Sequence, residues 1–150
     1  SLALDAFVQP GTTAVGVGHS IGAATLVALA GAQMWLGPGR RVNIAPDGRL
    51  TRLALLAPPT GFFQAPEALD AVRVPILAWA GSEDGITPPA QTEWLAHAMS
   101  GWQTVDVRVT AGAGHFSFMD LPPPQTTEPL PNKQAFLREY SSEVCRFLVG

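Results

Sequence analysis

The sequence predicts an α/β protein: a mostly parallel sheet with helices on both faces. Short apolar runs alternate along the chain with longer segments of helical periodicity, and this alternation is typical of parallel strands joined by crossover helices. The first apolar run is continuous, as expected of a strand buried on both faces. At 150 residues, with 47% hydrophobic and 14% charged, the chain is expected to form one globular domain (1–150) with its own core.

The first third of the chain contains a helix, a strand and a second helix. Ser1 to Val8 has apolar residues at helical spacing and is predicted to be the end of a helix. Thr13 to Val17 is the first strand. Ile21 to about Ala32 is apolar all round and rich in alanine, which favours a helix packed closely on a sheet, ended by Gly37-Pro38-Gly39. Arg40 to Gly48 is polar and is predicted to be a loop.

The middle of the chain repeats this order. Leu50 to Ala57 is the second strand and stops at Pro58-Pro59. A short amphipathic helix is expected over Pro66 to Val72. Val74 to Ala80 is the third strand, with a proline near its beginning, where a missing N–H is tolerated. Pro88 to Met99 is predicted to be a helix whose prolines suit the first turn.

The last third contributes one strand and one helix. Thr104 to Val109 alternates between valines and charged residues, a pattern that predicts a fourth strand. The closing helix is expected from about Asn132, because apolar side chains then recur with a period of 3.6 residues. These side chains are Phe136, Leu137, Tyr140, Val144, Phe147 and Leu148.

A G-x-S-x-G motif, Gly18-His19-Ser20-Ile21-Gly22, joins the first strand to the helix after it. A serine at such a turn has a strained backbone and an exposed Oγ, and flanking glycines avoid clashes between the crossing strand and helix. The start of the helix directs backbone N–H groups at the serine, so the N–H of Ile21 is a candidate donor to an oxyanion. A glycine-rich turn that merely contains serine is the alternative interpretation.

Three of the four predicted strands are followed by a residue suited to nucleophilic catalysis. Ser20 follows the first strand, Asp84 the third and His115 the fourth. Because the carboxyl ends of parallel strands meet at one edge of a sheet, these side chains are expected to lie together. Ser20 would be the nucleophile, His115 the base that takes its proton, and Asp84 the acid that orients the imidazole.

Several assignments stay open. Glu83, beside Asp84, is an alternative acid. His19 is interpreted as packing or as part of a substrate pocket. The other candidate pocket residues are Phe62, Phe63 and Phe116, and for Phe62 and Phe63 a core role is the alternative.

Composition excludes several classes of partner. The net charge of −3, without a basic stripe, argues against nucleic acid. No stretch is apolar enough for a membrane span and no signal peptide is visible, so no membrane partner and a cytoplasmic location are expected. No cluster of cysteines, histidines and carboxylates has metal-ligand spacing, so no metal is predicted.

The G-x-S-x-G motif, the segment Gly81 to Pro88 and the segment Gly114 to Phe118 together resemble the α/β-hydrolase family. They are most similar to its dienelactone-hydrolase-like and small serine-esterase branches, and the resemblance runs from Thr13 onward. It implies a Ser-His-Asp triad, no cofactor, and hydrolysis of a carboxylic ester or related small acyl compound. Dienelactone hydrolases have cysteine at the elbow, where this chain has Ser20.

The chain resembles only the C-terminal half of that fold: four strands after an initial helix. Family members have further strands before the elbow, and a loop there supplies a second oxyanion N–H. The elbow strand is therefore expected to be an exposed apolar edge, covered by the missing N-terminal half or by a second copy of the chain. The alternative functions are a weak or inactive fragment acting as a binding or assembly module, and an acyltransferase on the same scaffold.

Overall fold

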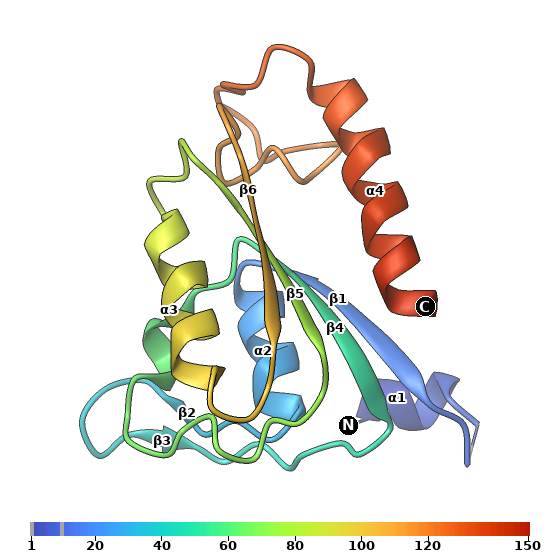
Figure 1. Ribbon diagram of the computed structural model, residues 1–150, viewed down its shortest axis with the longest axis vertical. Coiled ribbons are helices and arrows are strands. Elements are labelled where there is room, and N and C mark those ends of the chain that lie inside the picture. The colour runs from blue at the N-terminus through green and yellow to red at the C-terminus, as the bar shows by residue number, and fades with distance from the viewer. Residues whose placement is uncertain (1, 10) are drawn as a thin grey trace.

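The computed structural model describes residues 2–9 and 11–150 and contains a four-stranded, fully parallel sheet (Figure 1). The strand order is β1-β4-β5-β6. Its strands are β1 (Ala14–His19), β4 (Leu50–Leu56), β5 (Ile76–Gly81) and β6 (Val105–Thr110). Every neighbouring pair of strands is parallel, so all four carboxyl ends lie along one edge of the sheet, as predicted.

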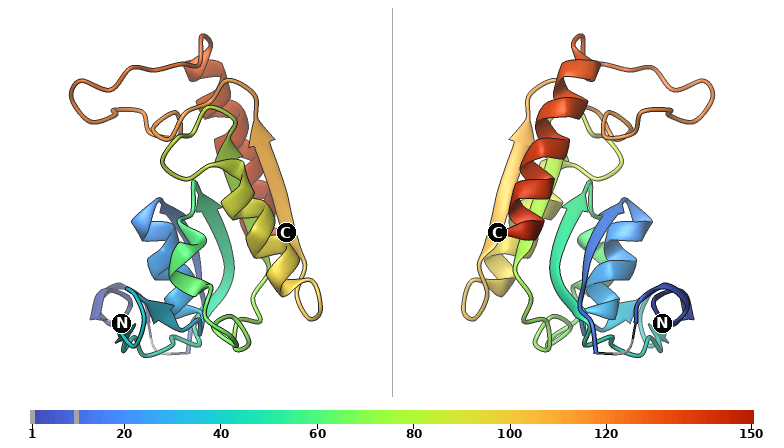
Figure 2. Two further views of the ribbon diagram at one scale, coloured as in Figure 1. Left: turned by 90° about the vertical axis from the view of Figure 1, so that its left-hand side faces the viewer. Right: turned by 90° about the vertical axis from the view of Figure 1, so that its right-hand side faces the viewer.

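Helices cover both faces of this sheet (Figure 2). Helices α2 (Ile21–Leu29) and α3 (Pro89–Met99), with one 3₁₀ turn, η1 (Thr60–Phe63), lie on one face, and α4 (Lys133–Val149) lies on the other. The short α1 (Leu2–Phe7) precedes β1. Alternate residues of β4 point to opposite faces. Leu53 and Leu55 pack in a core with α2, η1 and α3, whereas Ala54 and Leu56 pack in a second core against α4. The predicted α/β class is therefore confirmed.

The elbow strand β1 is an outer strand of the sheet, as the sequence led us to expect. Among the described residues it pairs only with β4. Val15 and Val17 are 47% and 53% exposed, and between them Gly16 faces Leu26 of α2. The two valines therefore lie on the α4 side of the sheet, at a position that α4 does not cover. An apolar edge strand with a free row of backbone groups remains open.

Two predictions about local structure were wrong. The second helix ends at Leu29 rather than near Ala32, because Gly31 has a φ of 116° and turns the chain away. Within the expected polar loop, β3 (Arg41–Val42) instead forms a short strand, which pairs antiparallel with β2 (Met34–Trp35). Two-residue strands carry too little periodicity to be recognised in a sequence.

The amphipathic helix expected over Pro66 to Val72 is also absent. This stretch forms successive tight turns, with Glu67 at a φ of 62°, a left-handed conformation that interrupts a right-handed helix. The helical turn of this connection lies earlier, at η1. In the described part of the chain, no helix combines the length and the apolar character needed to cross a membrane.

Candidate active site

Ser20 occupies a strained turn between β1 and α2. Its φ of 52° and ψ of −124° lie outside the regions that non-glycine residues normally adopt. The hydroxyl makes no capping bond to α2, so it is free to interact elsewhere. The N–H of Ile21 is at the first position of α2, where no intrahelical acceptor is available.

The two glycines of the motif differ in how much space surrounds them. A Cβ added to Gly18 would lie 2.7 Å from the backbone nitrogen of Ala23, so only glycine allows this close approach of strand and helix. A Cβ added to Gly22 would meet nothing within 4 Å. The expected clash is therefore confirmed for Gly18 and is wrong for Gly22 within this chain.

A chain of hydrogen bonds links Ser20, His115 and Asp84 across the carboxyl ends of three strands. The Oγ of Ser20 lies 3.0 Å from Nε2 of His115, and Nδ1 of His115 lies 2.8 Å from Oδ2 of Asp84. His115 and Asp84 are 7% and 3% exposed. With Nδ1–H donating to the carboxylate, Nε2 carries the lone pair and accepts the proton of the serine hydroxyl.

Asp84, and not Glu83, contacts the imidazole. The side chain of Glu83 is exposed and accepts a hydrogen bond from the Ser82 hydroxyl at 3.2 Å. Burial alone would raise the pKa of Asp84, but hydrogen bonds from Thr87, His115 and the N–H of Ile86 outweigh it and hold that pKa below its ordinary value. Asp84 is therefore a carboxylate at neutral pH and can stabilise a positively charged imidazole.

Thr87 is a buried partner of both Asp84 and His115 that the sequence analysis missed. Its N–H donates to Oδ1 of Asp84 at 2.7 Å, and its hydroxyl donates to Oδ2 at 2.7 Å. The same hydroxyl oxygen lies 3.0 Å from Nδ1 of His115. An aspartate that accepts N–H groups two and three residues further on forms a recognisable turn, so the spacing of Asp84 and Thr87 was the available signal.

His19 contacts the backbone of His115. Its Nε2 lies 2.7 Å from the carbonyl oxygen of His115, so this nitrogen carries a proton and donates it. Burial lowers the pKa of His19, partly opposed by the hydrogen bond to that carbonyl. The residue before Ser20 is thus tied to the loop that presents the imidazole, whether or not it also contacts a substrate.

The loop after β5 and the loop after β6 approach each other closely. A Cβ on Gly81 would lie 2.2 Å from the carbonyl oxygen of Ala113, which leaves room only for glycine. The N–H of Glu83 donates to that carbonyl at 2.9 Å, and the N–H of Gly112 donates to the Ser82 hydroxyl at 2.8 Å. These bonds set the distance between Asp84 and His115.

The candidate pocket residues divide into two groups. Phe116 lies edge-on to the His115 ring at 4.9 Å, beside the hydrogen-bonded residues. Phe63 is 2% exposed and Phe62 packs against the same core. The alternative core role thus fits Phe63, whose ring packs with α2 and α3 against the sheet, and the lining of the cavity beside His115 contains neither Phe62 nor Phe63.

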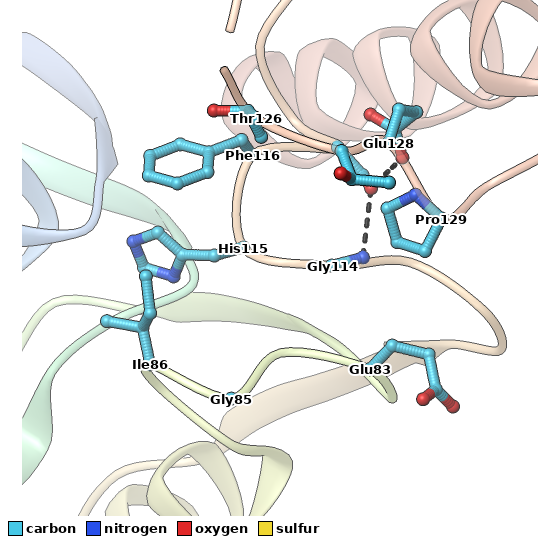
Figure 3. A pocket seen from close by; sticks show the side chains of 11 residues that line it. Glu83, Gly85, Ile86, Gly114, His115, Phe116, Thr126, Glu128 and Pro129 are labelled. Carbon is cyan, nitrogen blue, oxygen red and sulfur yellow. Dashed lines mark hydrogen bonds between the residues drawn. The ribbon is translucent and has the colours of Figure 1, made fainter. Parts of the chain in front are cut away.

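A cavity of about 200 Å³ adjoins His115 (Figure 3). It lies between the loop after β5 and the proline-rich segment 120–131. Glu128 fastens that segment to the histidine loop: its Oε1 accepts a hydrogen bond from the Ser117 hydroxyl at 2.6 Å, and Ser117 Oγ accepts one from the N–H of Gly114 at 2.9 Å. No sequence signal marked Glu128, since its partners come from separate segments.

The chain has the α/β-hydrolase fold, as comparison with solved structures shows. A monoacylglycerol lipase from Paleococcus ferrophilus matches 99% of this chain and 73% of its own, with a TM-score of 0.62 at 15% identity. A protein of unknown function from Agrobacterium tumefaciens, grouped provisionally with the alpha/beta hydrolases, matches 97% of this chain with a TM-score of 0.62 at 14% identity. An esterase domain from Rhodothermus marinus matches 99%, with a TM-score of 0.55 at 20% identity.

The chain covers 56% of the Agrobacterium protein, about half of its length. It covers 66% of the Rhodothermus domain. The sequence matches no protein-family model and no curated protein. The structural likeness therefore identifies the fold, and the activity has to be argued from the site.

Proposed function

We propose that this chain carries the catalytic residues of a serine hydrolase that cleaves a carboxylic ester or a related small acyl compound. The observation that supports this most directly is the hydrogen-bonded series Ser20–His115–Asp84, with contacts of 3.0 and 2.8 Å. Its members follow three strands of an α/β-hydrolase fold in the order nucleophile, acid, base. The names of the structural neighbours, a lipase and esterases, agree with this class of reaction.

In the proposed reaction the Ser20 oxygen attacks the carbonyl carbon of the ester while its proton passes to Nε2 of His115. The carbonyl oxygen becomes negative and is stabilised by the N–H of Ile21. The bond from carbon to the alcohol oxygen then breaks, and His115 returns the proton to that oxygen. Water repeats the sequence on the acyl-serine and releases the carboxylic acid. Asp84 stabilises the protonated imidazole in both halves.

We also propose that full activity needs a partner segment along β1. Its edge is unpaired in the described chain and exposes Val15 and Val17. Either further residues of the same protein or a second copy of this chain would cover the edge and place a second N–H opposite that of Ile21. Loss of one oxyanion donor typically costs about 10²–10³ in rate, so the 150-residue chain alone is expected to be slow.

A fluorophosphonate probe tests the proposal, since it reacts with a serine only when the base and oxyanion donor are in place. Intact mass and peptide mapping are expected to locate one adduct on Ser20, lost in Ser20→Ala and in His115→Ala. Ser100→Ala, at an exposed serine outside the site, is the matched control and should label like the wild type. An unlabelled wild type, or labelling that survives His115→Ala, would contradict the proposal and favour a binding module.

A further inference from the structure

The loop that presents His115 is a tight turn, and its first and last residues are joined by two hydrogen bonds. The N–H of Ser117 donates to the carbonyl oxygen of Gly114 at 3.2 Å, and the N–H of Gly114 donates to the Ser117 hydroxyl oxygen at 2.9 Å. Ser117 is 1% exposed, so water has little access to either bond. His115 and Phe116 are the central residues of the turn, and the double closure therefore restricts the backbone from which the imidazole projects.

The Ser117 hydroxyl depends on Glu128 for its orientation. A hydroxyl has one proton to donate and lone pairs that accept. The proton goes to Oε1 of Glu128 at 2.6 Å, and the lone pairs face the N–H of Gly114 (Figure 3). Because an ionised carboxylate can only accept, the direction of the bond from Ser117 to Glu128 is fixed, and a bond to a charged acceptor is stronger than a neutral one.

Glu128 is in turn anchored to α4. Its Oε1 also accepts the N–H of Leu130 at 3.0 Å, and its Oε2 lies 3.1 Å from Nζ of Lys133, the first residue of α4. Burial would raise the pKa of Glu128, but the bonds from Ser117, Leu130 and Lys133 outweigh it and lower that pKa. Glu128 is therefore a carboxylate at neutral pH, held by a helix that packs against the sheet.

The imidazole has to meet partners on two separate loops at once. Its Nε2 lies 3.0 Å from Oγ of Ser20, and its Nδ1 lies 2.8 Å from Oδ2 of Asp84. Asp84 and Thr87 both contact Nδ1, but a ring held at one nitrogen can still tilt its other nitrogen away from Ser20. The backbone of His115 limits that tilt, and it is fixed by the closed turn together with the bond from His19.

We propose that Ser117 and Glu128 are positioning residues for His115, and that together they keep Nε2 of the imidazole at hydrogen-bond distance from Ser20. This inference rests on the proposed hydrolase function and adds to it two residues that do not touch the reacting atoms. It also gives the proline-rich segment 120–131 a role in the reaction, since that segment brings Glu128 to the histidine loop.

The rate of Ser20 labelling by a fluorophosphonate at neutral pH tests this role. Ser117→Ala and Glu128→Ala each break the bond between the two side chains. A small misplacement of a reacting group can cost about 10²-fold in rate, so we expect labelling to slow about 10- to 100-fold in both variants. Glu128→Gln keeps an oxygen that accepts from Ser117 and should recover most of the rate. Ser142→Ala and Glu139→Ala, at exposed positions of α4, are the matched controls and should label like the wild type.

An NMR measurement reports on the imidazole directly and does not depend on labelling. With isotope-labelled histidine, the low-field resonance of the Nδ1 proton in the bond from His115 to Asp84 is expected to shift or broaden in Ser117→Ala and Glu128→Ala. It should return in Glu128→Gln. Backbone amide spectra establish that each variant is folded. If Ser117→Ala unfolds, the comparison of Glu128→Ala with Glu128→Gln decides the test.

The outcomes separate this inference from the function on which it rests. Wild-type labelling rates in Ser117→Ala and Glu128→Ala, or an unchanged His115 resonance in both, would overturn the positioning role and leave the hydrolase function standing. Equally slow labelling in Glu128→Gln and Glu128→Ala would also overturn it, because the accepted hydrogen bond would then not matter. An unlabelled wild type would overturn the hydrolase function and, with it, the positioning role.

Discussion

At the scale of single residues, the site depends on neighbours of the reacting groups as much as on those groups. Asp84 accepts hydrogen bonds from two backbone N–H groups, a hydroxyl and an imidazole. These bonds keep it charged despite its burial. The imidazole ring of His115 in turn contacts Asp84 and Thr87, and the backbone carbonyl of His115 accepts a hydrogen bond from His19. Thr87 and His19 are therefore positioning residues, and each leads to a test.

Thr87→Val removes the hydroxyl and keeps the shape of the side chain. A hydrogen bond to a charged group contributes about 1.5–3 kcal/mol, so we expect the rate of Ser20 labelling by a fluorophosphonate to fall about 10- to 100-fold. Substrate affinity should change little, since Thr87 is buried and faces Asp84. Thr87→Ser, which restores the hydroxyl, should recover most of the rate. A wild-type rate in Thr87→Val would show that the hydroxyl is not needed.

His19→Phe keeps an aromatic ring but loses the N–H that donates to the His115 carbonyl. A neutral hydrogen bond is worth about 0.5–1.5 kcal/mol, so labelling of Ser20 should slow about 2- to 10-fold. His19→Gln retains an N–H donor and should be closer to the wild type. If Gln and Phe reduce the rate equally, His19 acts through packing of its ring and not through this hydrogen bond.

At the scale of elements, three loops at the carboxyl ends of the strands hold one another in place. The Gly81–Ala113 approach joins the loop after β5 to the loop after β6. Glu128 then joins the proline-rich segment to the loop after β6, through Ser117 and Lys133. Because these contacts are polar and lie at the surface of the sheet, this end of the molecule should respond to acid through Glu128.

Glu128 provides a pH-dependent contribution to stability with a definite sign. Burial would raise its pKa, but bonds from Ser117, Leu130 and Lys133 outweigh this and lower the pKa from its ordinary 4.5. Below about pH 4.5 the unfolded chain binds this proton more readily than the folded chain, so folding loses stability as the pH falls. Above that pH the contribution is fully present.

We therefore expect the free energy of unfolding, measured with urea between pH 3 and 6, to fall less steeply with acid in Glu128→Gln than in the wild type. Glu139→Gln, at an exposed position of α4, is the control and should follow the wild-type slope. Parallel curves for Glu128→Gln and the wild type would mean that the Glu128 contacts do not persist in solution.

At the scale of the whole molecule, helices cover both faces of the sheet at its centre, whereas one face of the outer strand β1 is exposed. The two cores meet on β4 and β5, whose central residues are fully buried. Beyond them, Val15 and Val17 remain exposed on the α4 side of the outer strand. A parallel sheet is normally covered on both faces, so we propose that a further segment or a second copy binds along this edge.

Val17→Lys should reduce self-association of the 150-residue chain, because a lysine on an edge strand opposes strand pairing. Light scattering after gel filtration, over a range of protein concentrations, measures this directly. Leu121→Lys, at an 83% exposed loop position, is the matched control and should associate like the wild type. A wild-type chain that stays monomeric at every concentration would argue against pairing between copies and favour a separate covering segment.

The sequence by itself determined the order of elements, the class of fold and the residues expected to meet at the strand ends. These depend on local signals: apolar runs, helical periodicity, and a glycine-flanked serine whose spacing reflects a steric requirement. The parallel sheet and the meeting of Ser20, Asp84 and His115 were anticipated in this way, whereas the outer position of β1 was expected from the resemblance to the C-terminal half of the α/β-hydrolase fold. The short strands β2 and β3 and the turns over 66–72 were not, since backbone conformations such as that of Glu67 leave no periodic trace.

The tertiary structure alone decided which side chains support the reacting groups. The contacts of Thr87 and His19 with His115, the burial of Phe63 and the hydrogen bond between Glu128 and Ser117 all depend on distances between segments that are separate in the chain. The cavity beside His115 likewise exists only once segment 120–131 lies against the loop after β5. Such contacts follow from packing of the whole fold, and packing is a long-range property that no local pattern encodes.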